Sequence, residues 1–193
     1  MKKIIFNLGL SKTGTSSFTR LMKDLNLTSR HDMDISSHTI DELRKEFVYC
    51  DSFSGALTHR YKDIYEALPT SKYILTIRDS NSWLKSTRIH FRNADDGRGM
   101  GMKQYREAIY GTWKIWELSD EKLLEIYNNW NYNIIDFFKD KENFMILNFV
   151  NSTDTNKLMK ELLDFLELTE KVWRAGKSEK IKFPHSNESK VVK

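Results

Sequence analysis

The amino-acid sequence predicts an α/β fold in three layers, α/β/α, with a central parallel sheet of about four to five strands. Two features of the chain predict it. Short runs of β-branched and aromatic residues alternate with longer segments whose apolar side chains recur at helical spacing. In addition, a loop rich in glycine, serine and threonine follows the first run and opens a helix, which is typical of a P-loop-like phosphate-binding loop after strand 1.

The first half of the chain begins with an expected strand over residues 3–8, which are mostly apolar. A helix is expected over residues 16–25, because its apolar side chains form a single stripe. A short second strand is expected over residues 47–50. A helix over about residues 55–68 follows, and Pro69 ends it because the residue before a proline disfavours helical geometry.

The clearest strand of the sequence covers residues 73–77, which are aromatic and β-branched. Ser80 is expected to cap the helix that follows it. Residues 92–101 contain several glycines among polar side chains, and we interpret them as a surface loop that lines or covers an acceptor pocket.

The last part of the chain is expected to hold two helices around a fourth strand. Ser119 or Asp120 would cap a long helix, since apolar residues repeat at helical spacing after it. The strand is expected over residues 144–149. The final helix is expected over about residues 156–167, with leucines on its packed side.

The composition indicates one globular domain over residues 1–193, with a basic tail from about residue 177. The net charge of +4 is mild and no dense basic stripe occurs, so we expect no nucleic-acid partner. The apolar runs are too short to cross a bilayer, so we expect no membrane association. Cys50 is the only cysteine, which excludes an intramolecular disulfide, and a cytoplasmic location is the default.

The segment with the clearest chemical meaning reads LGLSKTGTSS over residues 8–17. Its glycines let the backbone curl so that several N–H groups face one anion, and the following helix adds a favourable dipole. In nucleotide triphosphatases the lysine directly follows the second glycine. Here Thr15 follows Gly14, and the lysine is Lys12, inside the loop. The usual arrangement for ATP or GTP hydrolysis is therefore disfavoured.

A second segment reads YILTIRDSNSWLKS over residues 73–86. It places Arg78 at the end of the expected strand and Ser86 in the helix after it. In a parallel sheet, ligands bind at the carboxyl ends of the strands, so these residues and the loop should open onto the same edge. Arg78 offers a planar fork for a phosphate group, and Ser86 adds a hydroxyl donor.

Together these two segments resemble the sulfotransferases that use 3′-phosphoadenosine 5′-phosphosulfate (PAPS). The resemblance implies that Lys12 stabilises charge on the leaving 5′-phosphate and that Arg78 and Ser86 bind the 3′-phosphate. It also implies PAPS as donor, adenosine 3′,5′-bisphosphate as product, and no metal. The donor-binding residues expected from it are Lys12, Thr13, Gly14, Thr15, Ser16, Ser17, Arg78 and Ser86.

The end of the chain adds a further resemblance. Residues 181–187 read IKFPHSN and are similar to the ending of a bacterial-type branch of this family. Where other members have an Arg-Lys-Gly run at the 3′-phosphate, this chain has Arg174 in a weak match. The histidines show no paired spacing, so a zinc site is not expected.

The catalytic base has two candidates. Related enzymes place an acidic residue or histidine after the second strand, which favours Asp51 as the catalytic base, with His59 as the alternative. Each is also compatible with a plain structural role. His31, Asp32 and Asp34 are interpreted as loop residues.

The acceptor is expected to be a small molecule or saccharide with a hydroxyl or amine group. Arg88, Arg92 and Arg98 hint at an anionic or sugar-like acceptor, although a solvated basic face explains them equally well. Two other functions stay open: a P-loop kinase for a nucleoside or other small molecule, and a non-catalytic nucleotide-binding module. The oligomeric state does not follow from the sequence.

Overall fold

The computed structural model describes residues 3–31, 39–55, 59–92, 100–169 and Phe183. Within them lies a five-stranded sheet in the order β2-β3-β1-β4-β5, and every neighbouring pair is parallel. The predicted fold class is thereby confirmed. The strands are β1 (Ile5–Asn7), β2 (Ser29–His31), β3 (Ser52–Ser54), β4 (Lys72–Thr76) and β5 (Phe144–Leu147).

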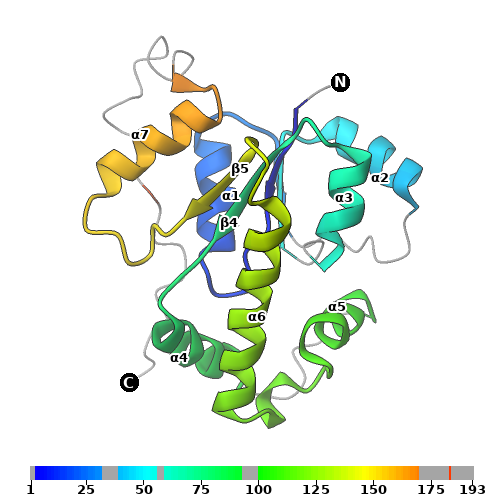
Figure 1. The fold of residues 1–193 in the computed structure, drawn as a ribbon, viewed down its shortest axis with the longest axis vertical. Helices are drawn as coiled ribbons and strands as arrows, with labels where there is room; N and C mark the ends of the chain where they lie inside the picture. The colour runs from blue at the N-terminus through cyan, green and yellow to red at the C-terminus, as the bar shows by residue number, and fades with distance from the viewer. Residues whose placement is uncertain (1–2, 32–38, 56–58, 93–99, 170–182, 184–193) are drawn as a thin grey trace.

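Helices cover both faces of this sheet (Figure 1). One face packs against α1 and α7, and the other against α2, α3 and α6. The α-helices are α1 (Thr15–Asp24), α2 (Ile40–Glu46), α3 (Tyr61–Ala67), α4 (Ser80–His90), α5 (Met100–Tyr110), α6 (Asp120–Phe138) and α7 (Thr155–Phe165). Short 3₁₀ helices are η1 (Phe47–Tyr49) and η3 (Ile115–Glu117).

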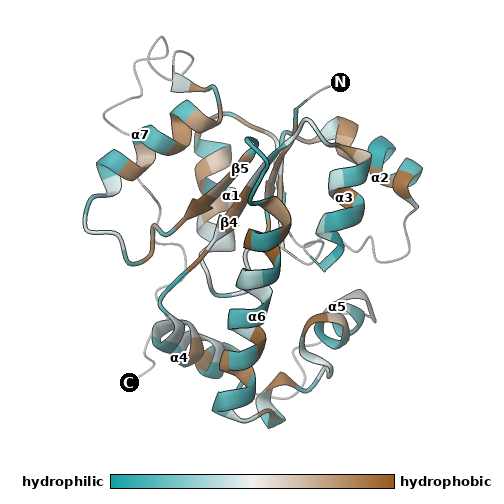
Figure 2. Cartoon of the chain, viewed as in Figure 1, coloured by the Kyte–Doolittle hydropathy of each residue, from teal (hydrophilic) through white to brown (hydrophobic). Residues whose placement is uncertain are grey.

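The alternation of side chains along the strands explains the two faces. Ile5 and Ile74 point into the layer with α1 and α7, whereas Phe6 and Tyr73 point into the layer with α3 and α6. Figure 2 shows the central strands mostly brown, with teal residues on the outer sides of α6 and α7. Because both faces are covered, the three central strands β1, β3 and β4 are almost entirely buried.

A third cluster of buried side chains lies beyond the carboxyl ends of the strands. It joins Trp83 of α4, Tyr110 of α5 and Tyr127 of α6 with Leu10, which follows β1. Figure 1 shows α4 and α5 on either side of the first half of α6. These helices therefore surround the sheet edge at which the loop after β1 lies.

Two of the expected elements differ in the structure. Residues 47–49 form the 3₁₀ helix η1, and the strand lies later, at Ser52–Ser54. β2 was not predicted at all. Both strands consist mainly of small or polar residues, so neither gives the apolar signal on which the strand predictions rested. Their backbone groups pair with β1 and with each other, which stabilises strands that propensity does not favour.

Helical segments were also missed or shortened. α2 was not expected, although Thr39 and Glu42 form a capping box at its start. α3 begins at Tyr61 rather than near residue 55. Of the expected loop at residues 92–101, residues 93–99 lie outside the described part of the chain, and Met100 and Gly101 belong to α5.

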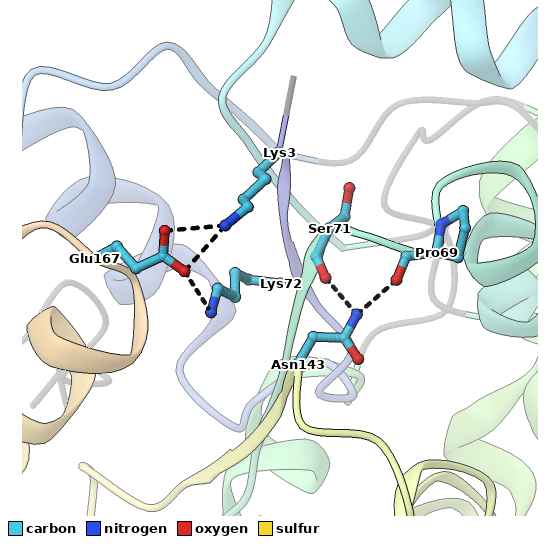
Figure 3. A network of polar contacts seen from close by, with 6 residues as sticks. All are labelled: Lys3, Pro69, Ser71, Lys72, Asn143 and Glu167. Carbon is cyan, nitrogen blue, oxygen red and sulfur yellow. Dashed lines mark hydrogen bonds and ion pairs between the residues drawn. The ribbon is translucent and has the colours of Figure 1, made fainter. Parts of the chain in front are cut away.

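The amino edge of the sheet is held together by charged side chains (Figure 3). Glu167, just after α7, accepts from Lys3 beside β1 at 3.0 Å and from Lys72 of β4 at 3.1 Å. Asn143 donates to the carbonyl oxygens of Pro69 and Ser71. This edge is opposite to the one that carries the glycine-rich loop.

Among the described helices, none combines the length and apolar character required to cross a bilayer.

Candidate active site

The loop between β1 and α1 has a tightly curled backbone. Lys12 has φ of 73° and Gly14 has φ of 98°, in the region that glycine adopts without strain. Gly14 is the N-cap of α1, and no side chain caps the helix there. The first N–H groups of α1 therefore need an acceptor from outside the helix, and the helix dipole favours an anion.

Two tryptophans hold carbonyl oxygens of this loop toward the protein. Trp130 Nε1 of α6 donates to the Leu8 carbonyl at 3.1 Å, and Trp83 Nε1 of α4 donates to the Ser11 carbonyl at 3.0 Å. A carbonyl oxygen that faces an anion would repel it. Because these oxygens are bound elsewhere, the arrangement suits a phosphate or sulfate group at the N–H side of the loop.

A buried network supports the loop from below. The Thr13 side chain is fully buried, and its hydroxyl donates to the Leu10 carbonyl at 2.7 Å and lies 2.8 Å from Thr76 Oγ1. Thr76 in turn donates to Asn7 Oδ1, which also accepts the Gly9 N–H. The predicted part of Thr13 in donor binding stays a prediction, because its hydroxyl is used inside the protein. Thr13 fixes the shape of the loop from inside.

Arg78 joins the loop to the start of α4. Its Nη1 donates to the Lys12 carbonyl at 3.4 Å, and its Nε donates to Ser82 Oγ at 2.7 Å. The backbone of Arg78 is held as well, since its N–H donates to Tyr127 Oη at 2.9 Å and its carbonyl accepts from that hydroxyl at 2.7 Å. The guanidinium therefore lies between the glycine-rich loop and α4, as the sequence pattern predicted.

Burial raises the pKa of Tyr127 above its ordinary value of 10.0. The phenol therefore stays protonated at neutral pH and keeps donating to the Arg78 carbonyl. Its ring stacks on Trp83 with centroids 4.3 Å apart. Trp83 and Tyr127 thus form one rigid support behind both the loop and Arg78.

Ser86 lies on α4, one helical turn after Ser82, so the two hydroxyls share a helix face. Ser82 Oγ accepts from Arg78 Nε and donates to the Asp79 carbonyl at 3.1 Å, so it holds the guanidinium in place. Ser82 was not among the predicted residues, although its position one turn before Ser86 is a signal for it. The predicted cap Ser80 is wrong: Asp79 is the N-cap, and its carboxylate accepts the Ser82 N–H at 2.9 Å.

The remaining predicted donor-binding residues lie at the turn into α1. Lys12 and Ser16 are half-buried, whereas Thr15 and Ser17 are mostly buried in the first turn of the helix. The structure therefore brings Lys12, Gly14 and the hydroxyl residues to one sheet edge, beside Arg78. Arg174, the basic tail and all of residues 181–187 except Phe183 lie outside the described residues.

Phe183 is the described residue of that C-terminal segment. It is buried, and its ring stacks on Phe149 with centroids 4.7 Å apart. A Cβ atom on Gly14 would lie 2.3 Å from the Phe149 ring. Phe149 therefore packs against the glycine-rich loop at a residue where only glycine fits, and Phe183 covers the ring of Phe149.

Asp51 does not lie at this edge, so its prediction as catalytic base is corrected. The strand was predicted to end before Asp51, but β3 starts at Ser52, so Asp51 precedes the strand and does not follow it. Its carboxylate accepts the Thr28 N–H at 2.8 Å, and its backbone pairs with Thr28 and Ile5. In a parallel sheet these contacts place Asp51 at the amino edge, away from the glycine-rich loop.

His59 lies beyond the carboxyl end of β3, on the loop side of the sheet. It is half-buried, and its ring packs edge-on to Tyr105 of α5 with centroids 6.1 Å apart. Of the two predicted bases, only His59 is on the correct edge.

His31 was interpreted as a loop residue, and the structure places it elsewhere. It is the last residue of β2, and its Nε2 lies 3.2 Å from Thr15 Oγ1. Asp32 and Asp34, assigned with it, lie outside the described residues. The sequence offered little signal for His31, because β2 is short and polar.

The described residues contain no group of three histidine, cysteine, aspartate or glutamate side chains placed to hold a metal ion. The polar groups gathered at the carboxyl edge are instead amides, hydroxyls, a lysine and an arginine. Such a set is suited to anions.

The fold and this edge define an α/β protein with a curled, glycine-containing loop between β1 and an uncapped α1. Residues 4–192 match the family model described as "Sulfotransferase domain", and the chain therefore belongs to the sulfotransferase family. No curated protein matches the sequence significantly. Among solved structures, shikimate kinase from Bacteroides thetaiotaomicron is similar with a TM-score of 0.49 and 13% identity, over 87% of this chain and 98% of that one.

Proposed function

We propose that this sulfotransferase takes the sulfuryl group from PAPS and transfers it to a hydroxyl or amine of a small-molecule or saccharide acceptor. The contact between Arg78 and the Lys12 carbonyl is the observation that carries the proposal. It sets a guanidinium beside the anion-binding loop, so that one ligand with two separate phosphate groups can engage both.

The residues present fit such a ligand. The uncapped start of α1, Lys12, and the hydroxyls of Ser16 and Thr15 would hold the 5′-phosphosulfate. Arg78 and Ser86 would hold the 3′-phosphate, while Ser82 positions the Arg78 guanidinium. A nucleotide without a 3′-phosphate would leave this second group of donors unused, which is a physical basis for selecting PAPS over ATP.

In the proposed reaction the acceptor oxygen or nitrogen attacks sulfur, while the bond from sulfur to the bridging oxygen breaks. Adenosine 3′,5′-bisphosphate leaves with the electron pair of that bond. Lys12 neutralises the charge that develops on the leaving 5′-phosphate, helped by the loop N–H groups. The arrangement aligns the donor for in-line transfer.

The acceptor proton needs a base, and we assign that role to His59. A histidine can accept a proton near neutral pH, and His59 lies on the loop side of the sheet. Its neighbour Tyr105, on α5, would then line the acceptor side.

We further propose one domain over residues 1–193 and a cytoplasmic location.

Calorimetric titration with adenosine 3′,5′-bisphosphate, with ATP and magnesium beside it, tests the proposal. We expect the bisphosphate to bind more tightly, and Arg78→Ala to abolish that preference. Binding of ATP-magnesium alone would contradict the proposal and favour a small-molecule kinase. Bisphosphate binding without transfer to any acceptor in a broad screen would favour a non-catalytic module.

A further inference from the structure

His31 and Thr15 come from distant parts of the chain and meet at the start of α1. His31 Nε2 lies 3.2 Å from Thr15 Oγ1. His31 ends β2, and Thr15 is the first residue of α1, directly after Gly14. The imidazole is half-buried and Thr15 is 6% exposed, so water competes little for this contact.

The backbone of Thr15 is fixed independently of His31. The Thr15 carbonyl accepts from Thr19 Oγ1 at 3.0 Å and from Ser54 Oγ at 3.4 Å, and these two hydroxyls lie 2.6 Å apart. Ser54 is also the register partner of His31 in the sheet. Thr19 and Ser54 thus hold the Thr15 backbone, and these contacts leave the direction of its hydroxyl proton to be set by other neighbours.

A threonine hydroxyl has one proton to donate and can accept in addition. If Nε2–H of His31 donates to Thr15 Oγ1, the threonine proton is free to point at an anion. If the threonine instead donates to His31, it presents only lone pairs to the anion and repels it. The hydrogen-bond direction between these two residues therefore decides whether Thr15 supports or opposes anion binding.

We propose that His31 is a positioning residue for the donor: its Nε2–H orients the Thr15 hydroxyl so that the threonine proton faces the 5′-phosphate side of the nucleotide. This inference rests on the proposed function and extends it to a residue that does not itself need to touch the ligand. It gives β2, the edge strand of the sheet, a part in donor binding.

Four variants test the proposal: His31→Ala, His31→Gln, Thr15→Val and the double variant His31→Ala with Thr15→Val. The measurement is the dissociation constant of adenosine 3′,5′-bisphosphate by calorimetry, with the melting temperature recorded for each variant. His90→Ala serves as control, because His90 is an exposed histidine on α4.

We expect His31→Ala to weaken bisphosphate binding about tenfold, as the loss of one oriented hydrogen bond implies. His31→Gln should recover most of the affinity, since its side-chain amide can donate to the same oxygen. Thr15→Val should weaken binding about as much as His31→Ala. In the Thr15→Val background, His31→Ala should have little further effect, because the hydroxyl that it orients is absent.

Unchanged affinity in His31→Ala would overturn the proposal. So would a loss that persists in full in the Thr15→Val background, or one that His31→Gln does not rescue, because either result indicates a general structural role. The Gln and Val variants keep the test valid if His31→Ala does not fold. A wild-type protein that fails to bind the bisphosphate would refute the proposed function itself, and this inference with it.

Discussion

Arg78 Nη1 lies 3.4 Å from the carbonyl oxygen of Lys12, and this contact joins β4 to the loop after β1 across the carboxyl edge of the sheet. The same guanidinium reaches Ser82 on α4 through Nε. One side chain thus links the glycine-rich loop to the first turn of α4. The proposed recognition of two phosphate groups on one nucleotide depends on this contact.

The first prediction concerns recognition of the 3′-phosphate. Ser86→Ala and Arg78→Lys should each weaken adenosine 3′,5′-bisphosphate binding by about tenfold or more while leaving adenosine 5′-phosphate binding nearly unchanged. Lysine keeps the charge but cannot make both contacts of the Arg78 fork. Calorimetry with both nucleotides checks this, with Arg20→Ala, an exposed arginine on α1, as control. Equal losses for both nucleotides would argue against a 3′-phosphate site here.

The second prediction separates chemistry from binding. Lys12→Met should lower the rate of sulfuryl transfer by about 10²–10³-fold, because the lysine acts on charge that develops in the transition state. Bisphosphate affinity should fall much less. Single-turnover kinetics with labelled PAPS provide the measurement, and Lys23→Met on the exposed side of α1 is the matched control. A turnover rate that survives the change at Lys12 would remove this residue from the catalytic machinery.

The third prediction compares two glycines with positive φ. Gly14 (φ 98°) lies against the Phe149 ring, whereas nothing lies within 4 Å of a Cβ placed on Gly111 (φ 72°). Gly111→Ala should cost about 1–2 kcal/mol, from backbone strain alone. Gly14→Ala should cost about 1–3 kcal/mol more, because the phenyl ring must move as well. Denaturant unfolding of both variants measures the difference. Equal costs would show that the Phe149 ring gives way freely.

The fourth prediction concerns stability in acid. Hydrogen bonds from Lys3 and Lys72 lower the pKa of Glu167 below its ordinary value of 4.5. A lowered pKa in the folded state means that Glu167 contributes stability above about pH 4.5, and that this contribution is lost as the pH falls below it. Glu167→Gln should therefore lower stability more at pH 7 than at pH 3, and added salt should shrink the difference, since the Lys3–Glu167 pair is exposed. Urea unfolding at both pH values checks this, with Glu107→Gln as control. A penalty that is the same at both pH values would rule out the ion pairs as its cause.

The sequence by itself determined the chemical character of the site. Gly14, Lys12 and the following hydroxyl residues are neighbours in the chain, so their arrangement depends on a local turn and the helix start that it opens. Arg78 and Ser86 follow for the same reason, since both are close to the end of a strongly apolar strand. Short-range geometry carries this information, and the structure places the loop and Arg78 at one edge of the sheet.

Only the tertiary structure decided which other residues join them. β2 and β3 are held by backbone pairing with neighbours and not by apolar side chains of their own, so local pattern did not locate them. The strand boundary before Ser52 moved Asp51 to the far edge of the sheet. The same pairing brought His31 from the end of β2 to Thr15, a contact that depends on strand order and register across the sheet.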